Sequence, residues 1–192
     1  MKGLVALLVV LLISPRALDA ATQDGFYVEL NPGQSSMNDA QVLLGPTVTF
    51  EGGATIGGAV GYRFPHHFRA EVNLAFHEAD VDRIDGDPGS GDVSITNYMA
   101  NVFYDFDLGS SPMDLYLGTG LGGSSVDLNA SSSMHNVDSI DGDVAFNLMV
   151  GASYRVHENI DLSLGYRYLF VFGGFGTDFE LHEVVIGVRY NF

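Results

Sequence analysis

Acidic and histidine side chains are the groups in this sequence that could perform chemistry. The acidic residues gather in two segments, Glu78, Asp80, Asp82, Asp85, Asp87 and Asp92, and then Asp127, Asp138, Asp141 and Asp143. Oxygen-rich segments of this kind can hold calcium or magnesium. Their spacing does not match the calcium-binding loop of helix-loop-helix proteins. We therefore interpret them as solvated acidic surface, and we predict no metal site and no cofactor.

Composition limits the classes of function. The chain has 192 residues, with 24 acidic and 8 basic residues, a formal charge of −16 and no cysteine. The length suits one domain. Nothing in such an acidic chain could neutralise a run of phosphates, which argues against a nucleic-acid partner. The absence of cysteine excludes disulfides and thiolate metal sites.

The first residues have the pattern of a secretory signal. Lys2 precedes an apolar run over residues 3–13, which Pro15 closes, and small residues follow as far as Ala20. The run is shorter than the ~20 residues that cross a bilayer as a helix. We predict a signal peptide over residues 1–20 and a single domain over residues 21–192.

Apolar residues in the remaining chain recur at every second position, which is typical of strands. At the C-terminus, Val184, Ile186, Val188, Tyr190 and Phe192 alternate with polar or small residues. The same alternation predicts eight strands, near residues 26–30, 56–64, 68–76, 97–106, 113–121, 144–154, 160–170 and 184–192.

The predicted connections alternate in length. Residues 65–67, 108–112 and 157–159 form tight turns, whereas residues 33–53, 79–92, 126–141 and 173–178 form long loops. Short turns at one end and long loops at the other are typical of outer-membrane barrels. We predict an all-β fold, an eight-stranded antiparallel up-and-down transmembrane β-barrel.

Charge assigns the two faces of these strands. All charges fall opposite the apolar residues, at Glu29, Arg63, Arg69, Glu71, Asp105, Asp114, Asp161, Arg167, Glu183 and Arg189. A strand protein in lipid must close on itself, because an unsatisfied backbone group in hydrocarbon costs several kcal/mol. The apolar face should therefore meet lipid and the charged face should line the interior.

The interior of eight strands is just wide enough for side chains to fill it. We predict that an ion-pair network plugs the lumen, formed by Glu29, Arg63, Glu71, Arg167 and Arg189. The alternative is that these groups are merely solvated inside a wet barrel.

Aromatic residues cluster at the short-turn ends of the predicted strands. They are Phe26, Phe64, Phe68, Tyr104, Phe106, Tyr154, Tyr190 and Phe192. Amphipathic rings favour the headgroup level of a bilayer, so we expect a belt at one membrane interface. The alternative is that aromatic residues are simply common in strands.

From Gly25 onward the sequence resembles the small eight-stranded outer-membrane proteins of Gram-negative bacteria, namely the OmpA-type membrane domain and the opacity-protein and surface-antigen family, often labelled porins. The segments that carry the resemblance are residues 58–64, 114–120, 164–168 and 188–192. The resemblance implies the cell outer membrane, contact with its lipid and lipopolysaccharide, and an assembly signal at Val188, Tyr190 and Phe192 that the outer-membrane assembly machinery reads. Because the chain ends at the eighth predicted strand, we expect no peptidoglycan-binding domain after it.

Three classes of function follow. The favoured class is a non-enzymatic structural and surface protein, in which four acidic extracellular loops serve envelope integrity, adhesion or partner binding, including a host ligand. The second is a narrow porin-like pore for small solutes. The third is a lipid-modifying enzyme, which needs a serine beside a histidine on the lipid side. His182 is the one outward histidine of the predicted strands, and the predicted register places no serine next to it.

Overall fold

The computed structural model describes residues 24–37, 40–41, 47–50, 52–84, 87–88, 91–109, 111–130, 140–172 and 179–192. The predicted signal peptide over residues 1–20 lies outside these ranges. The described residues contain no helix long and apolar enough to cross a membrane.

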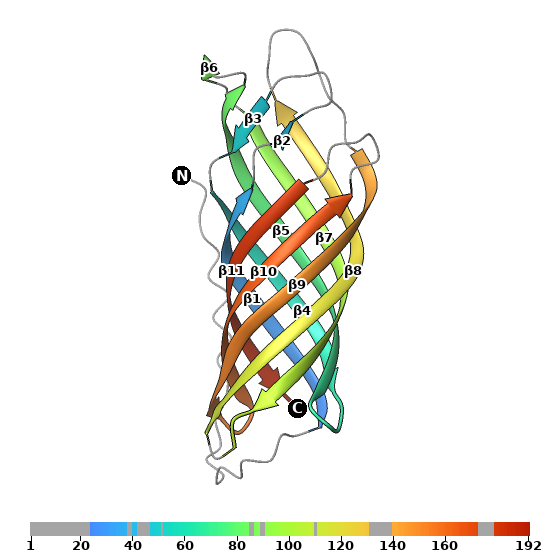
Figure 1. The fold of residues 1–192 in the computed structure, drawn as a ribbon, viewed down its shortest axis with the longest axis vertical. Coiled ribbons are helices and arrows are strands. Elements are labelled where there is room, and N and C mark those ends of the chain that lie inside the picture. Colours follow the sequence, from blue (N-terminus) through green and yellow to red (C-terminus); the bar gives the residue numbers. More distant parts are fainter. Residues whose placement is uncertain are drawn as a thin grey trace.

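Eight strands close into one antiparallel ring (Figure 1). They are β1 (Gly25–Met37), β4 (Gly53–Arg63), β5 (Phe68–Ile84), β7 (Gly91–Asp107), β8 (Met113–Ala130), β9 (Ile140–His157), β10 (Ile160–Phe172) and β11 (Phe179–Asn191). Chain neighbours in this set pair with each other, and β1 also pairs with β11 to close the ring. The predicted up-and-down barrel is confirmed.

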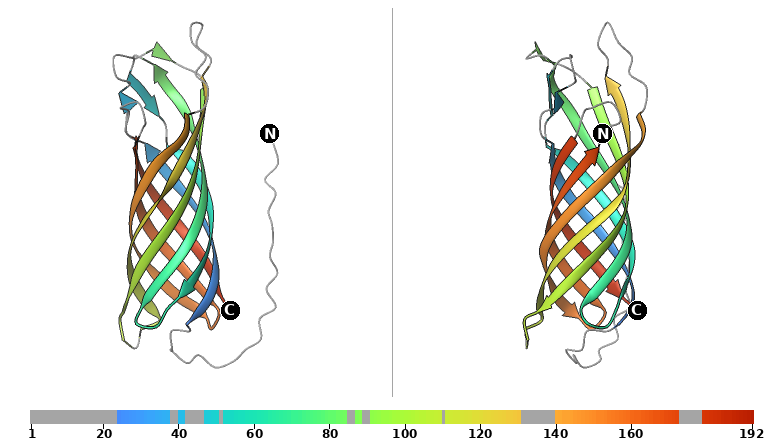
Figure 2. Two further views of the ribbon diagram at one scale, coloured as in Figure 1. Left: turned by 90° about the vertical axis from the view of Figure 1, so that its right-hand side faces the viewer. Right: turned by 45° about the vertical axis from the view of Figure 1, so that its right-hand side comes forward.

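Several strands run further than the sequence predicts. β5 and β7 have 17 residues each and β8 and β9 have 18 each, whereas β1, β10 and β11 have 13 each. Figure 2 shows the longer strands rising above the ends of β10 and β11. Parts of the predicted loops at residues 33–53, 79–92 and 126–141 are therefore strand, because pairing with a neighbour continues after the apolar alternation has ended.

Three short strands belong to the same long connections. They are β2 (Ala40–Gln41), β3 (Thr47–Phe50) and β6 (Asp87–Pro88). β2 pairs with β3, and both β3 and β6 pair with the upper part of β5. The sheet therefore extends beyond the ring at the end of the long connections.

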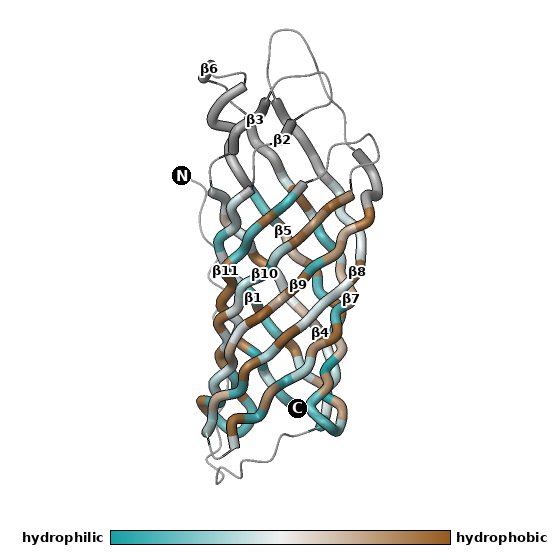
Figure 3. Tube along the Cα trace, viewed as in Figure 1, coloured by the Kyte–Doolittle hydropathy of each residue, from teal (hydrophilic) through white to brown (hydrophobic). Residues whose placement is uncertain are grey.

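Alternate residues of each strand face opposite sides of the wall, and hydrophilic and hydrophobic positions alternate along the tube in Figure 3. The outer face exposes large apolar side chains such as Val72 (66% exposed) and Leu121 (63%). The inner face buries the charged ones, including Arg69 and Glu183. Water-facing proteins distribute these classes in the opposite way, so the outer face is built for lipid.

The tight turns lie at one end of the barrel, together with the C-terminus (Figure 1). The turn between β4 and β5 places His66 and His67 at φ angles of 67° and 69°. This left-handed region is uncommon for residues other than glycine.

The rings predicted to form an interfacial belt lie on the outer face at this end. Many pack edge-on, with centroids 5.1 Å apart for Phe68 and Tyr104 and also for Tyr190 and Phe192. Tyr62 joins them, 4.9 Å from Phe26. The predicted belt thus corresponds to neighbouring aromatic rings on the outer face.

Candidate functional site

The lower half of the lumen, nearest the tight turns, holds a cluster of arginines and aspartates. Arg69 Nε lies 3.0 and 2.7 Å from the two carboxylate oxygens of Asp105. Arg63 bridges Asp105 and Asp161, at 3.8 and 3.5 Å. Arg155 Nε lies 3.5 Å from Asp161. Because each aspartate contacts more than one arginine, the strands β4, β5, β7, β9 and β10 are tied together across the ring.

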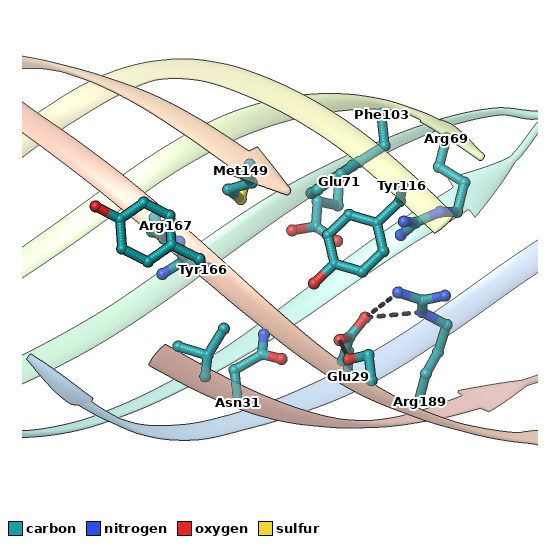
Figure 4. A pocket seen from close by; sticks show the side chains of 12 residues that line it. Glu29, Asn31, Arg69, Glu71, Phe103, Tyr116, Met149, Tyr166, Arg167 and Arg189 are labelled. Atoms are coloured by element: carbon teal, nitrogen blue, oxygen red, sulfur yellow. Dashed lines mark hydrogen bonds and ion pairs between the residues drawn. The ribbon is translucent and has the colours of Figure 1, made fainter. Parts of the chain in front are cut away.

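A second pair continues this cluster upward. Arg189 places Nε and Nη2 each 2.7 Å from Glu29 Oε2, as the dashed lines in Figure 4 show. Arg189 Nη1 lies 3.8 Å from Asp161, which connects the pair to the lower arginines. The Ser163 hydroxyl donates to Glu29 Oε1 at 3.2 Å.

Glu71 is held by hydrogen bonds. The Tyr27 hydroxyl donates to it at 2.8 Å, and Asn101 Nδ2 at 3.1 Å. Asn147 Nδ2 then donates to Asn101 at 3.0 Å. Among the described residues, no arginine forms an ion pair with Glu71; Arg69 reaches it indirectly, through a 3.4 Å hydrogen bond to Tyr27.

Arg167 belongs to a separate cluster in the upper half of the lumen. Its Nη1 lies 3.3 Å from Glu183 Oε2, and His77 Nδ1 lies 2.8 Å from the other oxygen of Glu183. His77 Nε2 in turn lies 2.8 Å from Asn97 Nδ2. Of the five residues predicted to form one network, Arg189 and Glu29 pair directly, and Arg63 is connected to them through Asp161. Glu71 is held by neutral hydrogen-bond donors, and Arg167 lies in a separate cluster.

Two further inward side chains are Asp114, a member of the predicted charged set, and His77. Asp114 is half-buried near the lower mouth, whereas His77 is fully buried. His77 is not one of the five residues predicted to form the network. Its contact with Glu183 could not be predicted without knowing that β5 and β11 face each other across the lumen.

Apolar side chains also fill the lumen. The prediction from the sequence considered only inward charges and did not include these side chains. Phe103, Tyr116 and Met149 form one buried cluster, and the Arg69 guanidinium lies 4.4 Å from the centroid of the Phe103 ring. Higher up, the buried inward side chains are Ile95, Ala145, Leu169, Val171 and Leu181, each at most 2% exposed. The upper lumen is thus closed by apolar groups together with buried polar side chains such as Asn97 and Ser124.

Glycines make room for the inward rings. A Cβ at Gly151 would lie 2.4 Å from Tyr116 Cζ, and one at Gly61 would lie 2.3 Å from Tyr27 Cζ. Each of these glycines is the cross-strand partner of the tyrosine that it accommodates, Gly61 of Tyr27 and Gly151 of Tyr116, so the arrangement depends on strand pairing.

A small cavity remains at the centre of the lumen. Its volume is about 20 Å³, and its lining includes Glu29, Arg69, Glu71, Tyr116 and Arg189 (Figure 4). Space of this size holds about one water molecule.

The outer face carries one correction. The predicted register places no serine beside His182, which lies on β11. In the structure, Ser36 on β1 is the direct cross-strand partner of His182. The sequence ended the first strand before Pro32 and Gly33. β1 continues past them because β4 pairs with these residues on the other side.

The predicted acidic segments are described in part. Glu78 is exposed on the outer face of β5, whereas Asp85 and Asp138 lie outside the described residues. In the part of the chain that the structure describes, no three histidine, aspartate or glutamate side chains form a group that could hold a metal ion.

A closed strand ring with an apolar outside and a charged inside defines a transmembrane β-barrel. The chain belongs to the outer membrane protein beta-barrel domain family, which matches residues 4–192. It is accordingly a protein of the Gram-negative outer membrane.

Among solved structures, the chain is similar to Neisserial surface protein A, with 24% identity, a TM-score of 0.67, and coverage of 88% of this chain and 97% of that one. It is also similar to OprG of Pseudomonas aeruginosa (16% identity, TM-score 0.56, coverage 88% and 97%). Ail, the attachment invasion locus protein of Yersinia pestis, solved with the heparin analogue sucrose octasulfate, has 13% identity, a TM-score of 0.54 and coverage of 88% and 100%. At these identities the likeness shows the fold.

Among curated proteins, uncharacterized proteins of Brucella suis and Brucella melitensis are each 28% identical over 168 residues. The match covers 71% of this chain and 59% of each relative. The chain thus spans about 59% of the length of the curated relatives it matches.

Proposed function

We propose that this protein is a structural and surface-interaction protein: a sealed barrel that holds acidic connections outside the cell, for envelope integrity or for binding a partner. The observation that carries the proposal is the filled lumen. Ion pairs and aromatic rings occupy its lower half, and apolar and neutral polar side chains around one ion pair occupy its upper half. Because the interior of the barrel is packed, other molecules can contact it only at its ends and on its outer wall.

The distribution of charge supports the proposal. Six basic residues follow residue 20, all arginines, and five of them, Arg63, Arg69, Arg155, Arg167 and Arg189, lie inside the barrel. Each contacts an inward carboxylate. The acid of the long connections is therefore left without an equal number of bases, and these connections are strongly negative.

This charge limits the chemistry of a surface partner. Ail was solved with a sulfated heparin analogue, and such a polyanion would be repelled by the acidic long connections of this chain. The partner that fits is a basic surface, or an anionic one joined through divalent cations. A host or other surface ligand of this basic class is part of the proposal.

Membrane partners follow from the outer wall. The apolar face would contact outer-membrane lipid and lipopolysaccharide. Val188 and Phe192 are exposed on the outer face at the last strand, and Tyr190 lies between them. We propose these three residues as the segment that the assembly machinery recognises.

Conductance is the test, because a narrow pore is the rival function. The purified barrel is inserted into planar bilayers, and single-channel steps are counted in a concentrated salt solution. We expect insertion without steps, because buried inward side chains from all eight barrel strands fill the lumen. Regular steps at each insertion would establish the pore instead.

A second experiment addresses the surface role. In a deletion strain of the source bacterium, uptake of a hydrophobic dye reports envelope integrity. We expect leakage that the wild-type chain repairs. If a variant with a shortened segment 131–139 also repairs the leakage, the barrel itself maintains envelope integrity. If that variant does not repair the leakage, the connection that contains these residues is responsible. Absence of leakage, together with no binding of basic protein surfaces, would contradict both forms of the proposal.

A further inference from the structure

The outer wall carries a polar patch at the upper ends of β1, β10 and β11. Ser36, His182 and Tyr168 form one cross-strand row, in which Ser36 pairs with His182 and His182 pairs with Tyr168. Tyr166 and Glu180 lie two residues from this row, on the same face. We call these five residues the outer polar patch.

The patch is internally organised. The Tyr166 hydroxyl lies 2.5 Å from His182 Nδ1, and the Tyr168 hydroxyl is hydrogen-bonded to the Glu180 side chain. The His182 ring lies between the two tyrosines, with centroids 5.3 Å from Tyr168 and 6.0 Å from Tyr166. These contacts fix the orientation of the imidazole on the outer face.

The free edge of His182 can donate a hydrogen bond in one tautomer of the imidazole. Because the Tyr166 hydroxyl can donate to Nδ1, the imidazole then carries its proton on Nε2. The two ring nitrogens point in different directions, so Nε2 faces away from Tyr166. Among the outward side chains of the barrel strands that the structure describes, His182 is the one ionisable nitrogen base. The exposed Ser36 hydroxyl lies on the next strand, directly opposite.

The depth of the patch in the membrane determines which part of a lipid it contacts. Eight residues separate His182 from Tyr190 in the lower aromatic belt, which places His182 about 20 Å above that belt for a strand tilted as in other barrels. The apolar band of such barrels is about 25 Å tall. The patch therefore lies just beneath the outer boundary of the hydrocarbon, where unpartnered polar groups are unfavourable.

The outer face of the neighbouring strand β9 is apolar at the same height. The β9 partner of Tyr168 is Leu148, and Phe146 and Val144 follow above it on the outer face. At the height of the row formed by Ser36, His182 and Tyr168, the outer wall thus changes from polar at β1 and β11 to apolar at β9. These strands are also shorter than β5, β7, β8 and β9 (Figure 1), so that material outside the bilayer can approach the patch from above.

We propose that the outer polar patch binds the phosphorylated sugar headgroup of an outer-leaflet glycolipid. His182 Nε2 and the Ser36 hydroxyl donate to a phosphate oxygen. The Glu180 carboxylate accepts from sugar hydroxyls, and the Tyr168 ring packs against the sugar. Phosphatidylglycerol offers a phosphate and glycerol hydroxyls but no sugar ring to pack against Tyr168, so it should bind less well than a phosphorylated glycolipid.

Native mass spectrometry of the folded barrel tests the proposal, with bis-phosphorylated lipid A and phosphatidylglycerol as separate probes. We expect one lipid A to be retained by the wild type in preference to phosphatidylglycerol. His182→Phe keeps an outward ring but removes both nitrogens, and it should reduce retention about fivefold, which corresponds to about 1 kcal/mol. Ser36→Ala should reduce it by a smaller factor.

Tyr98→Phe is the matched control, because Tyr98 is an exposed outward tyrosine on β7, away from the patch. Retention should be unchanged in this variant, whereas Tyr166→Phe, which frees His182, should weaken binding. Heat-modifiable gel migration verifies that each variant is folded, so that failure to bind is separated from failure of the barrel.

Equal retention by the wild type and His182→Phe would overturn the proposal, as would equal retention of phosphatidylglycerol and lipid A. A retained lipid that has lost one acyl chain would also overturn it, in favour of cleavage at Ser36 and His182. Because none of these outcomes depends on conductance or on the long connections, the proposed surface role can fail or hold independently.

Discussion

The lower and upper halves of the lumen are closed by different chemistry. Below, Arg63, Arg69 and Arg189 share Asp105, Asp161 and Glu29 within a continuous cluster. Above, one ion pair between Arg167 and Glu183 stands beside buried aliphatic side chains such as Leu169 and Leu181. The barrel is therefore sealed twice, below by a continuous charged cluster and above by apolar and neutral polar side chains around one ion pair.

The difference has a physical consequence. Buried charges are costly to desolvate, and removing one partner leaves the other uncompensated. Buried aliphatic groups leave a cavity when truncated. Substitutions in the two halves should thus weaken the barrel for separate reasons, and the lower half should be the more sensitive to loss of a single side chain.

The largest expected effect is that of Arg69→Ala. Arg69 is 1% exposed and is the nearest cation to Asp105, so its removal should destabilise the barrel by about 3–5 kcal/mol. Denaturant unfolding in detergent micelles measures the change. Arg155→Ala is the matched control, because Arg155 is more exposed and lies 3.5 Å from its partner. Equal losses from the two substitutions would contradict the role given to the buried cluster.

Leu181→Ala examines the upper half. Leu181 is 1% exposed on the inner face, and its truncation should cost about 2–4 kcal/mol. The same unfolding measurement applies. Val184→Ala, on the lipid-facing side of the same strand, should cost less, because lipid fills the space that the smaller side chain leaves. A greater loss at Val184 would show that the faces of β11 are assigned the wrong way round.

Gly151→Ala examines how closely the inward rings pack. The new Cβ would lie 2.4 Å from Tyr116 Cζ and 2.5 Å from the Leu164 carbonyl oxygen, which predicts a loss of about 1–3 kcal/mol through overpacking. Gly58→Ala, whose Cβ would lie no nearer than 3.6 Å to Glu29 O, should be close to neutral. A stable Gly151→Ala variant would indicate a looser lumen.

The smallest expected effect on stability is that of Arg167→Ala. His77 remains 2.8 Å from Glu183 as a second partner, so the loss should be about 1–2 kcal/mol. Single-channel steps should remain absent, because the charged cluster in the lower half still closes the lumen. An unchanged unfolding midpoint would show that Arg167 contributes nothing to stability, and the appearance of regular steps would show that the lower cluster alone does not seal the barrel.

The sequence predicts the fold because period-two alternation marks both the strands and the face that each residue takes. It does not predict strand ends such as Met37, since ladder pairing with β4 carries β1 beyond Pro32. Nor can it pair Arg167 with Glu183 and His77, because those contacts depend on which strands face each other across the ring. The pairing of Ser36 with His182 was missed for the first of these reasons.

The central claim is that the apolar face of each strand points to lipid and the charged face points to the lumen. A spin-label scan along β11 tests this claim most directly. The chain has no cysteine, so each introduced cysteine carries the sole label. In bilayers, labels at Val184, Ile186 and Val188 should be accessible to dissolved oxygen, and a label at Val185 should be protected. Protection at the three even positions with accessibility at Val185, or the same accessibility at all four, would contradict the account.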